Sequence, residues 1–211
     1  MSLDKPNLGV ATLEPTIAEF QDISTTIISD CLDRLPGCVG LTRFYTGPRM
    51  VGIAFTVQTR AGDNLAIHQA LEIARPGNII VVDGAGDTSR ALVGEIMKVI
   101  AETRGLGGFV IDGAIRDVEA FRASSFPCFA RAVIHRGPYK AGPGALGVPV
   151  TLGGTVICPG DIVVGDADGV VSFSPAIAET LLRSCRDRME QEEHMLQAIR
   201  NGTYDGRYAK S

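Results

Sequence analysis

Two short apolar runs limit the folds open to this chain more than any other feature. NIIVVD (78–83) and GFVID (108–112) are rich in β-branched and aromatic residues and are bounded by glycines or polar turns, as buried strands are. The helical pattern RALVGEIMKVIAETRG (90–105) lies between them. A strand, a helix and a second strand in this order form a βαβ unit whose strands run parallel. The sequence therefore predicts an α/β fold.

The remaining pattern extends this core on both sides. Polar starts followed by helically spaced apolar residues predict helices over 22–35 and 63–74, and Gly/Pro-rich 135–149 predicts a long loop. Alternation or short apolar runs predict these strands: 50–59, 127–133, 155–158, 161–165 and 169–173. A last helix, with Ser174 as N-cap and Pro175 at its first position, would end before Gly202 and span roughly 40 Å, enough to reach a partner subunit.

Composition bounds the organisation and the class of the protein. No low-complexity linker divides the chain, so we expect residues 1–211 to form a single domain. A net charge of −4 without any basic run argues against nucleic-acid binding. The apolar runs are too short for a membrane span, and the N-terminus lacks a signal-peptide pattern. Five cysteines without a C-x-x-C pair are typical of reduced core thiols, so we expect a cytoplasmic protein.

The two loops that follow the βαβ strands are the candidate site. Parallel strands send their following loops to the same sheet edge, where open α/β folds bind ligands. Glu95 and the adjacent pair Arg116-Asp117 lie beyond these strands and should meet there. Arg116 suits a carboxylate, and Asp117 suits a hard cation such as Mg²⁺. Two plainer interpretations stay open: Glu95 at the rim of an apolar helix face, and Arg116-Asp117 as a solvated helix start.

Three longer runs carry a resemblance to a known family. They are VVDGAGDTSRALVGEIM (81–97), GLGGFVIDGAIRDV (105–118) and VPVTLGGTVICPGDIVVGDADGVV (148–171). Over about residues 20–202 the chain resembles the class II 4-hydroxy-4-methyl-2-oxoglutarate / 4-carboxy-4-hydroxy-2-oxoadipate aldolases. That RraA-like family also contains the regulator of ribonuclease activity A. The resemblance implies an α-β-β-α layered sandwich like the swivelling β/β/α domain, with a long C-terminal helix. It also implies a homotrimer or hexamer with its site between subunits.

The resemblance also implies roles for individual residues. Asp117 would ligate Mg²⁺ or Mn²⁺, and Arg116 would hold the pyruvyl end of an oxo-acid substrate. Glu95 matches the acidic position at the head of the motif. The substrate would also face the backbone of three of its neighbours: Gly94, Ile96 and Met97.

A further acidic residue would come from the neighbouring subunit's C-terminal helix. Glu192 is the best match for this catalytic role, with Glu193 next to it, and Asp30 or Asp33 could add another carboxylate. One departure concerns the third residue after Arg116-Asp117. In aldolase members an acidic residue usually follows the pair after two positions, where this chain has Ala120. That difference bears on which substrate fits.

The implied reaction is retro-aldol cleavage of 4-hydroxy-2-oxo acids to pyruvate and a second oxo acid, with oxaloacetate decarboxylation as a side activity. A metal or a Schiff-base lysine can stabilise the enolate. The lysines argue against the second route, because Lys98 occupies a polar helix phase and Lys140 a Gly/Pro loop. The histidines, of which His68 is one, lack zinc-ligand spacing and are assigned structural or surface roles. The alternative is a non-catalytic regulator of ribonuclease activity that binds a protein partner.

Overall fold

The computed structural model describes residues 10–34 and 37–206. The helices are α1 (Val10–Glu19), α2 (Thr25–Cys31), α3 (Leu65–Ile73), α4 (Glu95–Thr103), α5 (Val118–Arg122) and α6 (Ala178–Arg200), with 3₁₀ turns η1 (Phe20–Asp22) and η2 (Pro175–Ile177). The strands are β1 (Thr42–Arg43), β2 (Met50–Thr59), β3 (Asn78–Asp83), β4 (Ala91–Val93), β5 (Gly108–Ile115), β6 (Cys128–Val133), β7 (Gly144–Leu146), β8 (Val150–Leu152), β9 (Thr155–Ile157), β10 (Ile162–Gly165) and β11 (Val170–Phe173). No helix in these described ranges is both long and apolar enough to cross a membrane.

One curled sheet holds most of the strands. Its order is β1-β6-β5-β3-β2-β10-β11, with β4 beside β5 and β7 beside β2, while β8 and β9 form a separate hairpin. β3 pairs in parallel with both β2 and β5, and β5 pairs in parallel with β6. The βαβ unit predicted from the sequence is therefore confirmed. β10 joins β2 antiparallel and begins the second half of the sheet.

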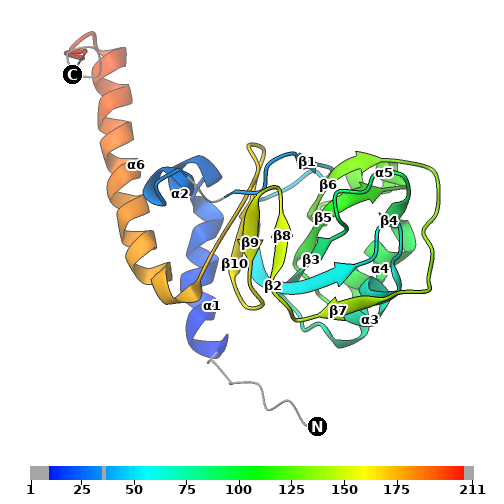
Figure 1. The fold of residues 1–211 in the computed structure, drawn as a ribbon. Coiled ribbons are helices and arrows are strands. Elements are labelled where there is room, and N and C mark those ends of the chain that lie inside the picture. The colour runs from blue at the N-terminus through cyan, green and yellow to red at the C-terminus, as the bar shows by residue number, and fades with distance from the viewer. Residues whose placement is uncertain (1–9, 35–36, 207–211) are drawn as a thin grey trace.

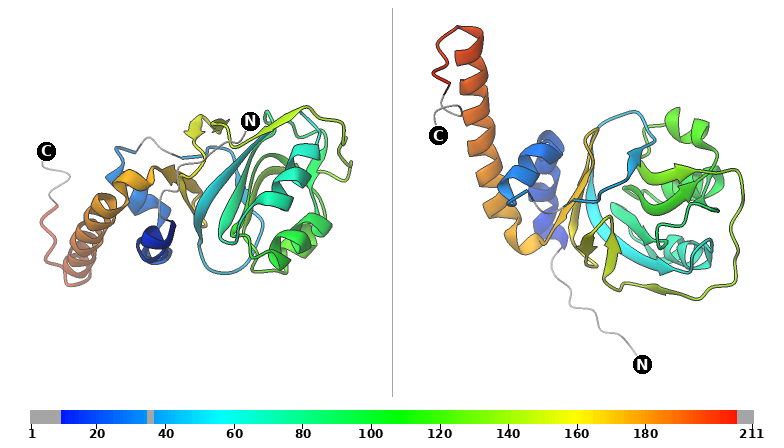
Figure 2. Two further views of the ribbon diagram at one scale, coloured as in Figure 1. Left: turned by 90° about the horizontal axis from the view of Figure 1, so that it is seen from below. Right: turned by 45° about the horizontal axis from the view of Figure 1, so that its top comes forward.

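Helices cover the two ends of this sheet in separate layers. α3, α4 and α5 lie beyond β3, β5 and β6, and α1, α2 and α6 lie on the far side of β10 and β11 (Figure 1). The views in Figure 2 show the curled sheet between the two helical groups, with α6 running away from the body of the molecule. A third apolar cluster fills the space between the two halves of the sheet and the β8–β9 hairpin. This arrangement is the predicted α-β-β-α sandwich.

Strand β2 packs against both groups of helices, and the alternation of its side chains explains how. Val51 and Ile53 pack against the cluster formed with α1, α2 and α6. Phe55 and Val57, further along the same face of the strand, pack against the cluster formed with α3, α4 and α5. Met50 points to the opposite face and is buried between the two halves of the sheet. One strand of period two thus connects the three apolar clusters.

The predicted helix over 90–105 is wrong at its start. The segment Ala91–Val93 is strand β4, and the helix begins only at Glu95. Leu92 and Val93 are buried because they belong to the sheet, whereas Ile96 and Val99 are 72% and 49% exposed. The apolar helix face expected from the sequence therefore combined residues of strand β4 with residues of helix α4.

Other boundaries also differ from the prediction. The helix predicted over 22–35 is limited to α2, and η1 before it ends at Asp22. The helix predicted over 174–202 begins with the 3₁₀ turn η2 and continues as α6. The loop predicted over 135–149 contains β7, which pairs with β2. The strand predicted over 108–112 continues to Ile115, so Gly113 does not end it. Helix α1 has no counterpart in the sequence prediction.

Candidate functional site

Strand β4 brings the two candidate loops into direct contact. It pairs in parallel with the end of β5, with Ala91 opposite Ala114 and Val93 opposite Ile115. The Arg116 amide continues this pairing and donates to the Val93 carbonyl at 3.0 Å. The segment before Glu95 and the segment at Arg116 are therefore neighbouring strands rather than two separate loops at one edge. The predicted meeting of these residues is confirmed, at closer range than the βαβ unit alone requires.

A β-bulge near the end of β5 sets the direction of the residues that follow. Opposite β6, the pairing moves from Ile111 with Ala130 to Ala114 with Ala132, so β5 contains one extra residue. An extra residue reverses which face the later side chains occupy. Asp112, within the bulge, is buried and forms an ion pair with Arg131.

Asp117 holds the start of helix α4. Its backbone is left-handed, with φ of 56°, a conformation that aspartate tolerates better than most residues. Its Oδ2 accepts a hydrogen bond from the Glu95 amide at 3.0 Å and lies 3.6 Å from Arg116 Nε. Asp117 precedes α5 in the chain, but its side chain does not cap that helix. It caps α4 instead, so the plainer interpretation is wrong in making Asp117 the side-chain cap of the following helix, although the pair does precede α5 and is 43% exposed.

Gly94 permits this contact because it has no side chain. A Cβ at this position would lie 2.6 Å from Asp117 Oδ2, 3.0 Å from Arg116 Cγ and 3.1 Å from Arg116 Nε. The first of these distances is a clash with an atom that is held in place by the Glu95 amide. Glycine at position 94 therefore lets the backbone of α4 approach the Arg116-Asp117 pair.

A small cavity lies against these residues. Its volume is about 90 Å³, on the order of three water molecules. Its lining includes four residues predicted to bind substrate: Gly94, Ile96, Met97 and Arg116. The first-turn amides of a helix lack intrahelical acceptors, so the start of α4 adds donors for an anion. Glu95 is exposed and is not part of the lining, although its amide anchors Asp117.

Three polar lining residues were not assigned to the site from the sequence: Asn64, His68 and Lys140. Asn64 and His68 are four residues apart at the start of α3, so they lie on one face of that helix. Burial, together with the nearby charge of Lys140, lowers the pKa of His68 and favours its neutral form. The spacing of Asn64 and His68 was visible in the sequence, but nothing there placed it opposite Arg116. Arg116 and Lys140 give this cavity a cationic lining suited to a carboxylate.

Asp63 fixes the wall that carries these three residues. Its side chain is fully buried; Oδ1 accepts from the Leu65 amide at 3.0 Å, and Oδ2 accepts from the amides of Ala141 and Gly142 at 2.7 and 2.9 Å. Burial alone would raise the pKa of Asp63, but these amides and the Arg60 guanidinium outweigh it and lower the pKa. One carboxylate therefore ties the start of α3 to the loop that contains Lys140.

The remaining acidic candidates lie on the other helical layer. Glu192 accepts from Arg188 Nε at 2.9 Å, and the same arginine donates to Asp30 at 3.1 Å. Their helices, α6 and α2, are on the side of the sheet opposite to α4 and α5 (Figure 1). Neither they nor the nearby Glu193 and Asp33 join Arg116 within one chain. A role for Glu192 requires a second copy and stays a prediction.

Asp117 is suited to a hard divalent ion but not to a cage of protein ligands. Within residues 10–34 and 37–206, no three His, Cys, Asp or Glu side chains are grouped closely enough to enclose a metal. Mg²⁺ is commonly held by one or two carboxylates, several waters and oxygens of the substrate. The Asp117 carboxylate is 43% exposed and could serve such an ion. The buried thiol of Cys38 has a pKa raised to about 12 by burial, which does not favour a thiolate ligand.

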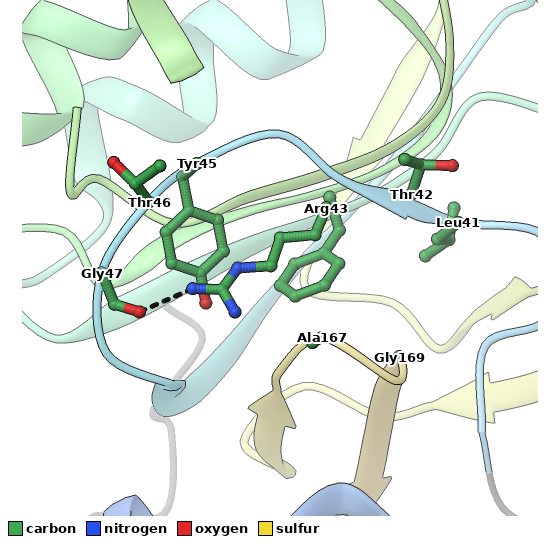
Figure 3. Close-up of a pocket in the computed structure, with 9 residues that line it drawn as sticks. Leu41, Thr42, Arg43, Tyr45, Thr46, Gly47, Ala167 and Gly169 are labelled. Carbon is green, nitrogen blue, oxygen red and sulfur yellow. Dashed lines mark hydrogen bonds between the residues drawn. The ribbon is translucent and has the colours of Figure 1, made fainter. Parts of the chain in front are cut away.

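A larger hollow lies between the β1–β2 connection and the β10–β11 turn (Figure 3). Its volume is about 670 Å³, but Arg43 is the one charged side chain among its lining residues. That guanidinium stacks on the Tyr45 ring at 4.1 Å and donates to the Gly47 carbonyl at 2.6 Å. The hollow has neither a carboxylate nor a histidine in its lining, so the smaller cavity at Arg116 is the better candidate for chemistry.

We expect Gly94→Ala to lower the free energy of unfolding by about 1–3 kcal/mol, because the added methyl group would displace Asp117. Urea denaturation measures the loss, and faster hydrogen exchange of the Glu95 amide would locate it. Gly37→Ala is the matched control, since a Cβ there would meet the Val170 carbonyl oxygen at an ordinary 3.6 Å. Equal effects of the two changes would contradict this account of Gly94.

We expect Asp63→Asn to destabilise the protein by about 1–3 kcal/mol at pH 7, because an amide cannot serve all the donors around this position. The lowered pKa means that the ionised group stabilises the fold above the ordinary carboxyl pKa of about 3.9. That contribution disappears as the pH falls through the lower folded value. Urea denaturation from pH 7 to pH 3 should therefore show the two proteins converging. A constant difference across this range would contradict the assignment.

Comparisons with known proteins agree with the fold and with the motifs. The family described as RraA-like, Aldolase/RraA, matches residues 25–172. A protein of Halalkalibacterium halodurans, provisionally named a 4-hydroxy-4-methyl-2-oxoglutarate aldolase, is 41% identical over 184 residues, covering 87% of this chain and 88% of that protein.

Two solved structures are similar over most of their length. An uncharacterised protein of Pseudomonas syringae is 30% identical with a TM-score of 0.82, covering 90% of each chain. The RNA-processing inhibitor RraA of Thermus thermophilis is 28% identical with a TM-score of 0.67, covering 73% of this chain and 93% of its own. With the family match extending over most of the sequence, this chain belongs to the RraA-like (Aldolase/RraA) family.

Proposed function

We propose that this protein cleaves 4-hydroxy-2-oxo acids by a metal-dependent retro-aldol reaction, releasing pyruvate and a second oxo acid. The observation that carries the proposal is the single cavity that gathers Arg116, Gly94 and the start of α4 beside Asp117. The named function of the Halalkalibacterium halodurans relative supports an aldolase. Oxaloacetate decarboxylation should accompany the cleavage, because both reactions pass through the same pyruvate enolate.

The residues around the cavity have distinct tasks in this proposal. Arg116 binds the carboxylate or oxo group of the pyruvyl end and stabilises negative charge as it develops there. Amides at the start of α4 orient the same end of the substrate. Mg²⁺ or Mn²⁺ at Asp117 would supply Lewis-acid polarisation of the 2-oxo group. Lys140 and neutral His68 face the remainder of the substrate.

The lysines favour this route over a Schiff base. Lys98 is buried and not in a polar phase as predicted, but its Nζ forms an ion pair with Glu102 at 2.8 Å. Lys140 reaches the cavity from an exposed position. A Schiff-base lysine needs desolvation or a neighbouring cation that depresses its pKa, and neither lysine has a buried, unpaired ammonium group.

A regulatory role is the second candidate. Ile96 and Val99 expose apolar surface on α4, next to the cavity, where a protein partner could bind. The similarity to the RNA-processing inhibitor RraA supports this alternative. In that case the cavity would have no turnover, and replacement of Ile96 would weaken inhibition of a ribonuclease. The presence of Asp117 beside Arg116 makes the enzyme the first choice.

Replacement of Asp117 tests the reaction directly. Asp117→Asn keeps an oxygen that can accept from the Glu95 amide but removes the charge needed to hold a divalent ion. We expect pyruvate release from 4-hydroxy-4-methyl-2-oxoglutarate and from oxaloacetate to fall at least about a hundredfold, with little change in stability. Chelator should have the same effect on the wild type. Asp168→Asn, at an exposed position between β10 and β11 and outside the cavity lining, should have none. Turnover that survives chelator, or a covalent substrate adduct that is trapped by borohydride, would point to a lysine instead.

The second copy can be tested by mixing variants. We propose a homotrimer or hexamer in which Glu192 of one copy completes the site of the next. Asp117→Asn and Glu192→Gln should each be inactive alone. Co-expression should restore roughly a quarter of the sites, because random pairing brings intact Asp117 and intact Glu192 together in that share of interfaces. Full activity of Glu192→Gln alone would exclude the role.

A further inference from the structure

Asn64 is a buried side chain with one unused polar atom. It is 3% exposed and lines the cavity at Arg116. Its Nδ2 donates to the Leu92 carbonyl at 2.9 Å and approaches Met97 Sδ at 3.4 Å. Its Oδ1 has no hydrogen-bond partner anywhere in residues 10–34 and 37–206. Buried polar atoms are almost always paired, so an unpaired one beside a cavity calls for a donor within that cavity, either a water or a ligand atom.

The orientation of this amide follows from its neighbours. The Leu92 carbonyl can only accept, so the NH₂ group and not the oxygen must face it. Turning the amide over would place two oxygens against each other and leave the NH₂ without this acceptor. The acceptor that remains free is therefore Oδ1.

The other polar groups of the cavity mostly need acceptors rather than supply them. Arg116 and Lys140 carry donors alone. The nearby carbonyls are already engaged: that of Leu92 by Asn64, that of Val93 by the Arg116 amide, and that of Gly94 by the Lys98 amide. Neutral His68 has one acceptor nitrogen but is only half-buried. A ligand with carboxylates alone would satisfy the cations and leave Asn64 Oδ1 unpaired.

We propose that Asn64 Oδ1 accepts a hydrogen bond from a hydroxyl group of the ligand, so that the site selects hydroxy-substituted oxo acids over their unsubstituted counterparts. The inference rests on the proposed function, because the cationic groups hold the carboxylate end. The amide of asparagine is not basic and takes no proton from the hydroxyl. Asn64 is thus a specificity-determining residue, and its loss should affect substrates according to whether they carry the hydroxyl group.

The test compares two reactions in one variant. Asn64→Leu keeps the approximate size of the side chain and removes the acceptor. We expect kcat/KM for pyruvate release from 4-hydroxy-2-oxoglutarate to fall about tenfold or more, and that for oxaloacetate decarboxylation to change less than about threefold. Gln69→Leu, an exposed amide on the same helix, is the matched control and should change neither. Equal losses in both reactions, or no loss in either, would overturn the inference.

A binding measurement separates this inference from the proposed function. If the wild type releases pyruvate from neither compound, the proposed function fails, and thermal unfolding with 4-hydroxy-2-oxoglutarate or 2-oxoglutarate then judges Asn64. The hydroxy acid should raise the Tm more than 2-oxoglutarate in the wild type and equally in Asn64→Leu. Equal shifts in the wild type would refute the role of Oδ1. Should the leucine variant not fold, Asn64→Ser, whose shorter side chain withdraws the acceptor, is judged by the same comparisons.

Discussion

The hydrogen bond from the Glu95 amide to Asp117 Oδ2 joins the two segments on which the candidate site depends. The carboxylate to which we assign the metal in our proposal is also a helix cap, so the position of Asp117 and the start of α4 are set together. The positive end of the helix dipole attracts the negative charge of a carboxylate placed there. Because Gly94 has no side chain, the start of α4 can come this close to Asp117 and Arg116.

A second aspartate does the same for the opposite wall of the cavity. Asp63 binds amides of α3 and of the loop after Tyr139, just as Asp117 binds the amide of α4. In both cases the carboxylate oxygens accept hydrogen bonds from backbone amides and so fix a segment of the chain. These two fixed segments carry side chains that line the cavity. The cationic groups of the site, Arg116 and Lys140, therefore come from two walls that are fixed by separate anions. This arrangement explains how an acidic protein can present a cationic cavity.

The sequence predicted the parts of this fold that depend on local pattern. The strands 78–83 and 50–59 match β3 and β2, since long runs of apolar or alternating residues have few other structures available. The start of α4 was mispredicted because Leu92 and Val93 continue its helical spacing while pairing with β5. Tertiary pairing overrides local periodicity in such a short strand.

Some residues of the candidate site could likewise be predicted from the sequence, and others could not. Arg116, Asp117 and Gly94 follow from their place after the parallel strands and from the family motif. Asn64, His68 and Lys140 come from an earlier helix and a Gly/Pro-rich loop. Their approach to Arg116 depends on Asp63 and on the path of the chain across β7, neither of which leaves a local signature. Sequence pattern alone had no means of placing them opposite Arg116.

The extra residue in β5 limits how the segment before Arg116 can be altered. The direction of the side chains after the bulge depends on the number of residues between Ile111 and Ala114, and not on the chemistry of any one residue there. Deleting a single residue at 112–113 would leave Arg116 and Asp117 in the chain. Each of the two side chains would then point to the face of the sheet opposite to the one it now occupies. In this chain, the length of the segment before Arg116-Asp117 is thus as informative as the residues of the pair.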